Sequence, residues 1–170
     1  MKKINLLLFI VFSLLLGQDR SLLFNAGPPN TRDGFIITNN GNEGTAIADK
    51  FFVADDYVLE AFYVYLKLVD SDSGSVNIKL HNDLNDSPGT IIYSWDVTID
   101  PRDDVLDDYF ISTVGECHSM SGGNNYWLSI SVNEPDVQVL WGYSPFDSYY
   151  SSISEDLGII SSMNLYEFSS

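Results

Sequence analysis

Three segments of the chain alternate apolar and polar residues with a period of two, and this pattern restricts the fold more than any other feature. The segments are SVNIKL at 75–80, TIIYSWDVTID at 90–100 and NYWLSISVN at 125–133. Because successive side chains of a strand point to opposite faces, each segment predicts a half-buried β-strand. The side chains expected to face the core are Val76, Ile78, Leu80, Ile91, Tyr93, Trp95, Val97, Ile99, Tyr126, Leu128, Ile130 and Val132.

Further runs of β-branched and aromatic residues predict strands at 34–39, 46–53, 57–69, 107–114 and 137–143. The connections between them are rich in Gly, Asn, Asp, Ser and Pro, which favour turns. In HNDLNDSPGT, residues 81–90, the Pro-Gly pair is expected to fix the turn. Roughly seven or eight strands without a convincing helix predict an all-β fold, an antiparallel β-sandwich with a jelly-roll-like or immunoglobulin-like path.

The first residues have the pattern of a secretory signal peptide. Lys2 and Lys3 precede an apolar run from Leu6 to Leu16, interrupted only by Ser13. A membrane span needs about 20 apolar residues, so we expect cleavage near residue 17, no transmembrane segment in the mature chain, and a secreted or cell-surface protein. The expected organisation is a signal peptide at 1–17, an N-terminal strand and loop at 18–45, the sandwich core at 46–143, and an edge segment or tail at 144–170.

The chain is strongly acidic, with 24 Asp and Glu against 8 Lys and Arg and a net charge of −16. A nucleic acid partner is therefore not expected, because phosphate backbones are bound by clustered basic side chains. An acidic surface suits an extracellular medium, and a second interpretation is calcium binding by carboxylates in short loops. The candidate ligands are Asp55, Asp56, Asp70, Asp72, Asp103 and Asp104. Such loop carboxylates more often simply face water.

The loop at 81–90 has Asp and Asn residues at alternate positions, as an EF-hand calcium loop does. Numbered from Asp83, it has Pro88 at the position of the required Gly and Ser94 at the position of the bidentate Glu. Both essential features are missing, so the EF-hand interpretation is rejected.

The order of several motifs resembles the choice-of-anchor β-sandwich domains of bacterial secreted and surface proteins. The resemblance covers roughly residues 46–143 and implies a jelly-roll-like module without a known catalytic centre, displayed on or released from the cell. Lys50 departs from the pattern, which commonly has a second acidic residue there, and no sorting helix follows the domain. The matching residues are Ala48 and Asp49 with Phe51 or Phe52, then Pro88 and Gly89, then Tyr126, Trp127 and Leu128.

No catalytic residue is identified in the sequence. The many carboxylates contain no motif that selects a pair for glycoside hydrolysis, and no GxSxG motif accompanies His81 or His118. Cys117, the single cysteine, is adjacent to His118, and adjacent residues of an extended chain point to opposite faces. An enzyme, such as a hydrolase, is the least favoured interpretation.

In the segment 57–69 the side chains expected to face the core are Phe62, Val64, Leu66 and Leu68. Three aromatic residues alternate with expected core positions: Tyr63, Tyr65 and Trp127. If they face solvent together, they form a platform for stacking on sugars, whereas packing into the protein is the favoured alternative because large aromatic residues dominate β cores. The first hypothesis is a non-enzymatic extracellular module for surface or matrix interaction, with a surface protein or glycan as partner. The second is a carbohydrate-binding module with a structural calcium ion.

Overall fold

In a computed structural model of the protein, the described residues are 34–39, 44–100, 106–113, 115–116, 118–142, 149–156 and 159–167, and in the last two ranges only the backbone is considered. Residues 1–17, Asp103, Asp104, Cys117 and Tyr143 lie outside the described residues. The elements of the described part are twelve β-strands, and all their pairings are antiparallel. The prediction of an all-β antiparallel fold is confirmed.

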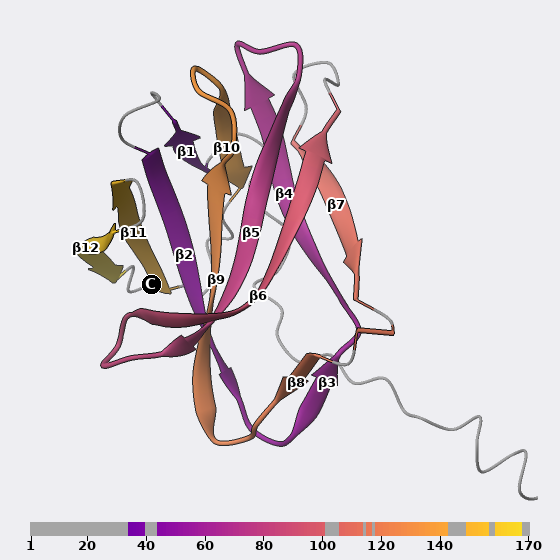
Figure 1. The fold of residues 1–170 in the computed structure, drawn as a ribbon, viewed down its shortest axis with the longest axis vertical. Helices are drawn as coiled ribbons and strands as arrows, with labels where there is room; N and C mark the ends of the chain where they lie inside the picture. Colours follow the sequence, from indigo (N-terminus) through magenta and orange to yellow (C-terminus); the bar gives the residue numbers. More distant parts are fainter. Residues whose placement is uncertain are drawn as a thin grey trace, which may run out of the picture.

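Two sheets make up most of this structure, and they lie one behind the other (Figure 1). The smaller sheet has four strands, in the spatial order β1 (Gly34–Thr38), β10 (Gln138–Gly142), β4 (Ala61–Val69) and β7 (Asp107–Ser112). The larger has six, in the order β12 (Ile159–Glu167), β11 (Tyr149–Asp156), β2 (Gly44–Val53), β9 (Asn124–Val132), β5 (Gly74–Asp83) and β6 (Pro88–Ile99). A third, short sheet pairs β3 (Tyr57–Leu59) with β8 (His118–Met120).

The core lies between the inner faces of the two large sheets. Alternate residues of each strand point inward, so one continuous apolar cluster receives side chains from both sheets. This arrangement is a β-sandwich, as the alternation predicts, while the jelly-roll path stays a prediction. The buried members of the cluster are Ile37, Val64, Leu66, Ile111, Val139 and Trp141 from the smaller sheet, and Ile47, Val76, Ile78, Ile99, Ile130 and Val132 from the larger.

The strand predicted at 57–69 is divided into two. Strand β3 ends at Leu59 and pairs with β8 in the short sheet, whereas β4 begins at Ala61 and belongs to the four-stranded sheet. The tail also differs from the single edge strand or loose segment expected there. Strands β11 and β12 form a hairpin, and β11 pairs with β2, so this hairpin extends the six-stranded sheet.

The turn of the β5–β6 hairpin is not formed by the Pro-Gly pair. Asn85 and Asp86 have φ values of 54° and 64°, which matches a type I′ turn, whose two central residues both need positive φ. Pro88 and Gly89 instead belong to β6. A Cβ atom on Gly89 would lie 2.9 Å from the Cβ atom of Leu84 and 3.0 Å from the backbone oxygen of Asn82, so the glycine permits the close approach of the two strands.

Irregular pairing near His81 changes the course of this hairpin. The register shifts between Leu80 and His81 and again before Asp83, and β-bulges of this kind bend a strand. Ile91 was predicted to face the core, but it is 44% exposed because the shift removes it from the alternation that begins at Tyr93. The tip of the hairpin then turns sideways across the sheet (Figure 1). We call residues 81–89, which form this tip, the strap.

Candidate functional site

Two large aromatic side chains lie side by side on the outer face of the four-stranded sheet. Tyr63 on β4 and Phe110 on β7 are direct partners in the strand register, and their ring centroids are 4.9 Å apart with planes inclined by 46°. Their inward neighbours, including Val64 and Ile111, are buried, whereas Tyr63 is 60% and Phe110 57% exposed. The pair is therefore open to solvent, with the core behind it.

The same face continues along β4 with further side chains of mixed character. Tyr65 and Lys67 follow Tyr63 at every second residue of β4 and so point to the same side. Tyr65 is opposite Asp108 on β7, and Lys67 is opposite Leu140 on β10. Leu140 is in turn opposite Ile36, which is 53% exposed. We call this set the aromatic face, and its members are Ile36, Tyr63, Tyr65, Lys67, Asp108, Phe110 and Leu140.

Trp127, the third predicted ring, is not part of this face. It lies on β9 in the other sheet, is fully buried, and clusters with Ala46 and Ala48 of β2. The prediction of a platform formed by Trp127 together with Tyr63 and Tyr65 is therefore wrong. Trp127 points to the side of the six-stranded sheet that the strap covers. The favoured alternative of packing is correct for Trp127 and wrong for Tyr63, which is 60% exposed.

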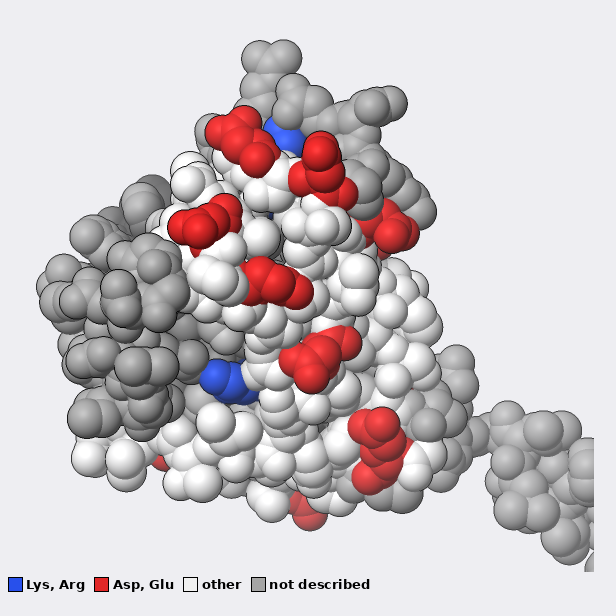
Figure 2. Space-filling model, turned by 45° about the horizontal axis from the view of Figure 1, so that its top comes forward, with Lys and Arg blue, Asp and Glu red and all other residues white. Residues whose placement is uncertain are grey.

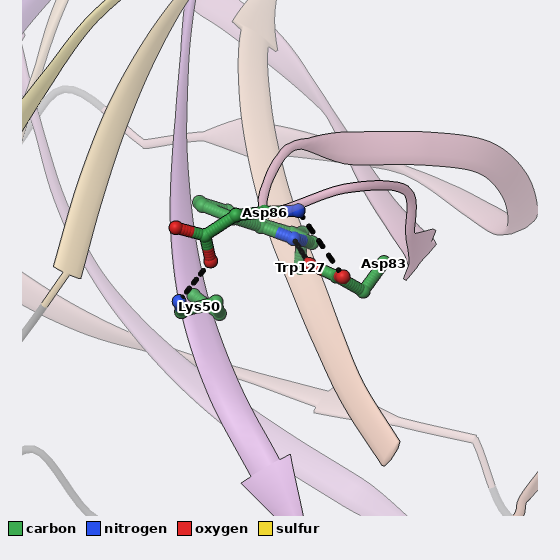
Figure 3. A network of polar contacts seen from close by, with 4 residues as sticks. All are labelled: Lys50, Asp83, Asp86 and Trp127. Atoms are coloured by element: carbon green, nitrogen blue, oxygen red, sulfur yellow. Dashed lines mark hydrogen bonds and ion pairs between the residues drawn. The ribbon is translucent and has the colours of Figure 1, made fainter.

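The strap is held to the sheet by a network of polar contacts (Figure 3). The indole Nε1 of Trp127 donates a hydrogen bond of 2.8 Å to Oδ1 of Asp83. Lys50 on β2 forms an ion pair with Asp86 and places its ammonium group 5.6 Å from the centre of the Trp127 ring, within the range of a cation–π interaction. Two strands of the sheet thus each contact the strap.

A buried serine–histidine pair fixes the base of the strap. Nε2 of His81 is 2.7 Å from Oγ of Ser129, and Nδ1 is 3.1 Å from the carbonyl oxygen of Gly89. A nucleophile and base with an orienting acceptor have this general arrangement in hydrolases. His81 and Ser129 are only 1% and 2% exposed, however, so a substrate does not reach them in this conformation. In this conformation the contact between the two side chains satisfies a buried polar atom of each.

The predicted calcium ligands do not converge in the described part of the chain. Asp56 accepts a hydrogen bond of 2.8 Å from the backbone N–H of Gly122, Asp70 has a φ of 55° in its turn, and Asp55 and Asp72 are exposed. Among the described residues, no three His, Cys, Asp or Glu side chains come together as a metal site. Figure 2 shows the acidic side chains on one side of the molecule as separate groups. Calcium binding stays a prediction.

Phe110 is the aromatic residue of the aromatic face that sequence reasoning missed. The sequence predicts a strand at 107–114, and this prediction by itself does not say which of its residues face outward. Tyr109 packs against the core and Ile111 is buried, which places Phe110 on the opposite face. That local pattern would have identified Phe110 as an outward-facing ring.

Asp49 is a buried carboxyl group that the sequence did not single out as unusual. Its position on β2 lies between Ile47 and Phe51 in the alternation, and it is opposite Leu128 in the register. Burial raises its pKa to about 7, partly offset by a hydrogen bond from the backbone of Lys50. Among the residues whose side chains the structure describes, none forms a hydrogen bond with its Oδ1 atom.

His118 is enclosed by aromatic rings. Its ring centre is 3.7 Å from that of Tyr93 and 5.3 Å from that of Trp95, and its Nε2 is 2.5 Å from Oε2 of Glu116. These contacts join β8, which belongs to the short sheet, to β6 of the large sheet. The imidazole ring is therefore buried at the contact between these two sheets.

Comparison of the chain with protein-family models, with curated proteins and with solved structures gives no match. The resemblance to choice-of-anchor domains stays a prediction. In the part of the chain that the structure describes, no helix is long and apolar enough to span a membrane.

Proposed function

We propose that this protein is a non-enzymatic extracellular module that binds surface or matrix molecules through its aromatic face. The observation that carries the proposal is the Tyr63–Phe110 pair, in which both rings are more than half exposed. An outward ring contributes little to the core, whereas exposed aromatic groups commonly supply the contact area of binding sites. Export through the expected signal peptide would place this face outside the cell.

The other sheet is a weaker candidate for binding. Its outer side carries the strap, which covers Trp127 and is held by contacts to Lys50 and Ser129. A ligand would have to displace those contacts to reach the indole ring. The enclosed His81–Ser129 pair supports the non-enzymatic part of the proposal in the same way, since it is closed to substrate.

The proposal is tested by removing both rings while keeping residues that favour strands. A Tyr63→Thr, Phe110→Thr double variant retains β-branched side chains at both positions. Phe52→Thr is the matched control, because Phe52 is similarly exposed, at 57%, but lies on β2 in the other sheet. Binding of the labelled mature protein is measured on immobilised polysaccharides, matrix proteins and lipid vesicles.

The double variant is expected to lose at least tenfold in affinity for the surface that the wild-type protein binds, with an unchanged circular dichroism spectrum. The Phe52→Thr control is expected to bind like the wild type. Equal binding by the wild type and the double variant would show that the aromatic face is not the binding site.

A further inference from the structure

We infer that the ligand of the aromatic face is a neutral polysaccharide, with Tyr63 and Phe110 stacked on sugar rings and Tyr65 and Asp108 hydrogen-bonded to its hydroxyl groups. This inference rests on the proposed function and names the chemical class of its ligand. It is carried by the order of side chains on the face and by the charge of the chain.

The two exposed rings define what the ligand must offer. Phe110 has no polar atom in its side chain, so it contributes by apolar and π contact alone. Its ring and that of Tyr63 are held next to each other by the β4–β7 register, and aromatic side chains have few rotatable bonds to immobilise on binding. A sugar ring presents C–H groups on its faces and therefore matches such a surface.

The polar groups on the next pair of residues define the rest of the ligand. Tyr65 and Asp108 are opposite each other, two residues along their strands from the ring pair, which corresponds to about 7 Å. The carboxylate of Asp108 accepts hydrogen bonds, and the phenol of Tyr65 both donates and accepts them. A ligand that contacts both pairs must carry hydroxyl groups beyond the stacked ring, so a chain of linked sugars fits better than a single sugar.

The charge of the protein favours neutral polysaccharides over acidic ones. The net charge of −16 repels anionic polymers. The aromatic face itself carries one acidic and one basic side chain, Asp108 and Lys67, so it offers no cluster of cations that would bind such polymers. Acidic polysaccharides and anionic lipid surfaces are therefore disfavoured. A neutral polysaccharide meets no such repulsion.

A protein partner matches the face less well. Standard protein interfaces bury about 800 Å² on each partner around a dry, apolar centre. Here Asp108 is next to the rings, so a protein partner would have to supply a cation of its own to pair with this carboxylate inside the interface. Polysaccharide complexes keep water at their margins, so the carboxylate stays hydrated or bonded to hydroxyl groups.

The test is a binding panel that separates ligand classes. Cellulose, mannan and mixed-linkage β-glucan serve as neutral probes, alginate and hyaluronan as acidic probes, and collagen and anionic vesicles as the remaining surfaces. The wild-type protein, the Tyr63→Thr, Phe110→Thr double variant, Tyr65→Phe and the Phe52→Thr control are each measured by sedimentation or calorimetry.

The inference predicts binding to at least one neutral polysaccharide, weakened at least tenfold in the double variant and several-fold in Tyr65→Phe, and unchanged in Phe52→Thr. Affinity should rise with the length of soluble fragments of that polysaccharide. Binding only to acidic, protein or lipid probes, and lost in the double variant, would overturn the inference while leaving the proposed binding face intact. Neutral-polysaccharide binding that the double variant retains, or no binding to any probe, would contradict both.

Discussion

The indole nitrogen of Trp127 donates a hydrogen bond of 2.8 Å to the carboxylate of Asp83, which joins two residues 44 positions apart. Trp127 is fully buried on β9, and Asp83 lies at the end of β5 where the strap begins. A buried N–H group needs an acceptor, and this contact supplies it. The strap therefore completes the burial of the largest side chain on this side of the six-stranded sheet.

Replacing Asp83 with alanine should destabilise the protein substantially. The buried indole N–H would lose a charged acceptor, and the free energy of unfolding should fall by about 1–3 kcal/mol. Urea unfolding measures the change. Asp72→Ala is the matched control, because Asp72 lies in an exposed turn, and it should alter stability by less than about 0.5 kcal/mol. Equal stability of the two variants would contradict the role assigned to Asp83.

The ion pair between Lys50 and Asp86 should matter less than the Trp127–Asp83 bond. The Asp86 side chain is 57% exposed, and exposed ion pairs contribute about 0–1 kcal/mol. Asp86→Asn removes the charge while retaining a residue that tolerates the positive φ of this position. The expected loss is below about 1 kcal/mol and should diminish in 1 M salt, where surface charges are screened. A larger loss that does not depend on salt would contradict this assignment.

Asp49 should make stability depend on pH. Its pKa is about 7 in the folded protein and 3.8 is the ordinary value, so between these pH values the folded state holds a proton that the unfolded state releases. The contribution of Asp49 to stability is then greatest below about pH 4, falls as pH rises to about 7, and is level above that. The slope contributed by this one group is at most about 1.4 kcal/mol per pH unit.

An Asp49→Asn variant tests this dependence, because asparagine does not titrate. The difference in unfolding free energy between the variant and the wild type, measured by urea unfolding at pH 4, 5, 6 and 7, should shift in favour of the variant as pH rises. A difference that is the same at all four pH values would show that Asp49 ionises normally in the folded protein.

Two consecutive glycines in the turn before β9 are required for different reasons. A Cβ atom on Gly122 would lie 2.6 Å from the Cα atom of Asp55, whereas Gly123 has open space around it but a φ of 75°. Gly122→Ala should therefore lower the free energy of unfolding by about 1–3 kcal/mol through the clash with backbone. Gly123→Asn should be milder than Gly123→Val, because asparagine adopts positive φ more readily than a β-branched residue. Thermal unfolding of the three variants checks the order.

Local alternation in the sequence predicted much of the sandwich. Val76, Ile78 and Leu80 are buried as their spacing indicates. Tyr63 points outward because it is next to the buried Val64 on the same strand. These outcomes depend only on the period of a strand, which each segment specifies by itself.

The features that define the candidate site depend on contacts between distant segments. Whether outward-facing Trp127 is exposed depends on the strap, whose course follows from bulges near His81. The partner of Tyr63 depends on the register between β4 and β7, which no single segment specifies. The raised pKa of Asp49 likewise depends on burial of its carboxyl group by other segments of the chain. For these reasons the sequence suggested Tyr63 and Tyr65 as ligand contacts but grouped them with Trp127 instead of Phe110.

Oxidative footprinting tests the central claim, binding through the aromatic face, most directly. Hydroxyl radicals modify exposed aromatic side chains, and Tyr63, Phe110 and Phe52 are all more than half exposed in the free protein. With the polysaccharide that binds best, modification of Tyr63 and Phe110 should fall several-fold, while that of Phe52 stays unchanged. Protection of Phe52 with continued modification of Tyr63 and Phe110 would place the ligand on the other sheet and contradict the proposal.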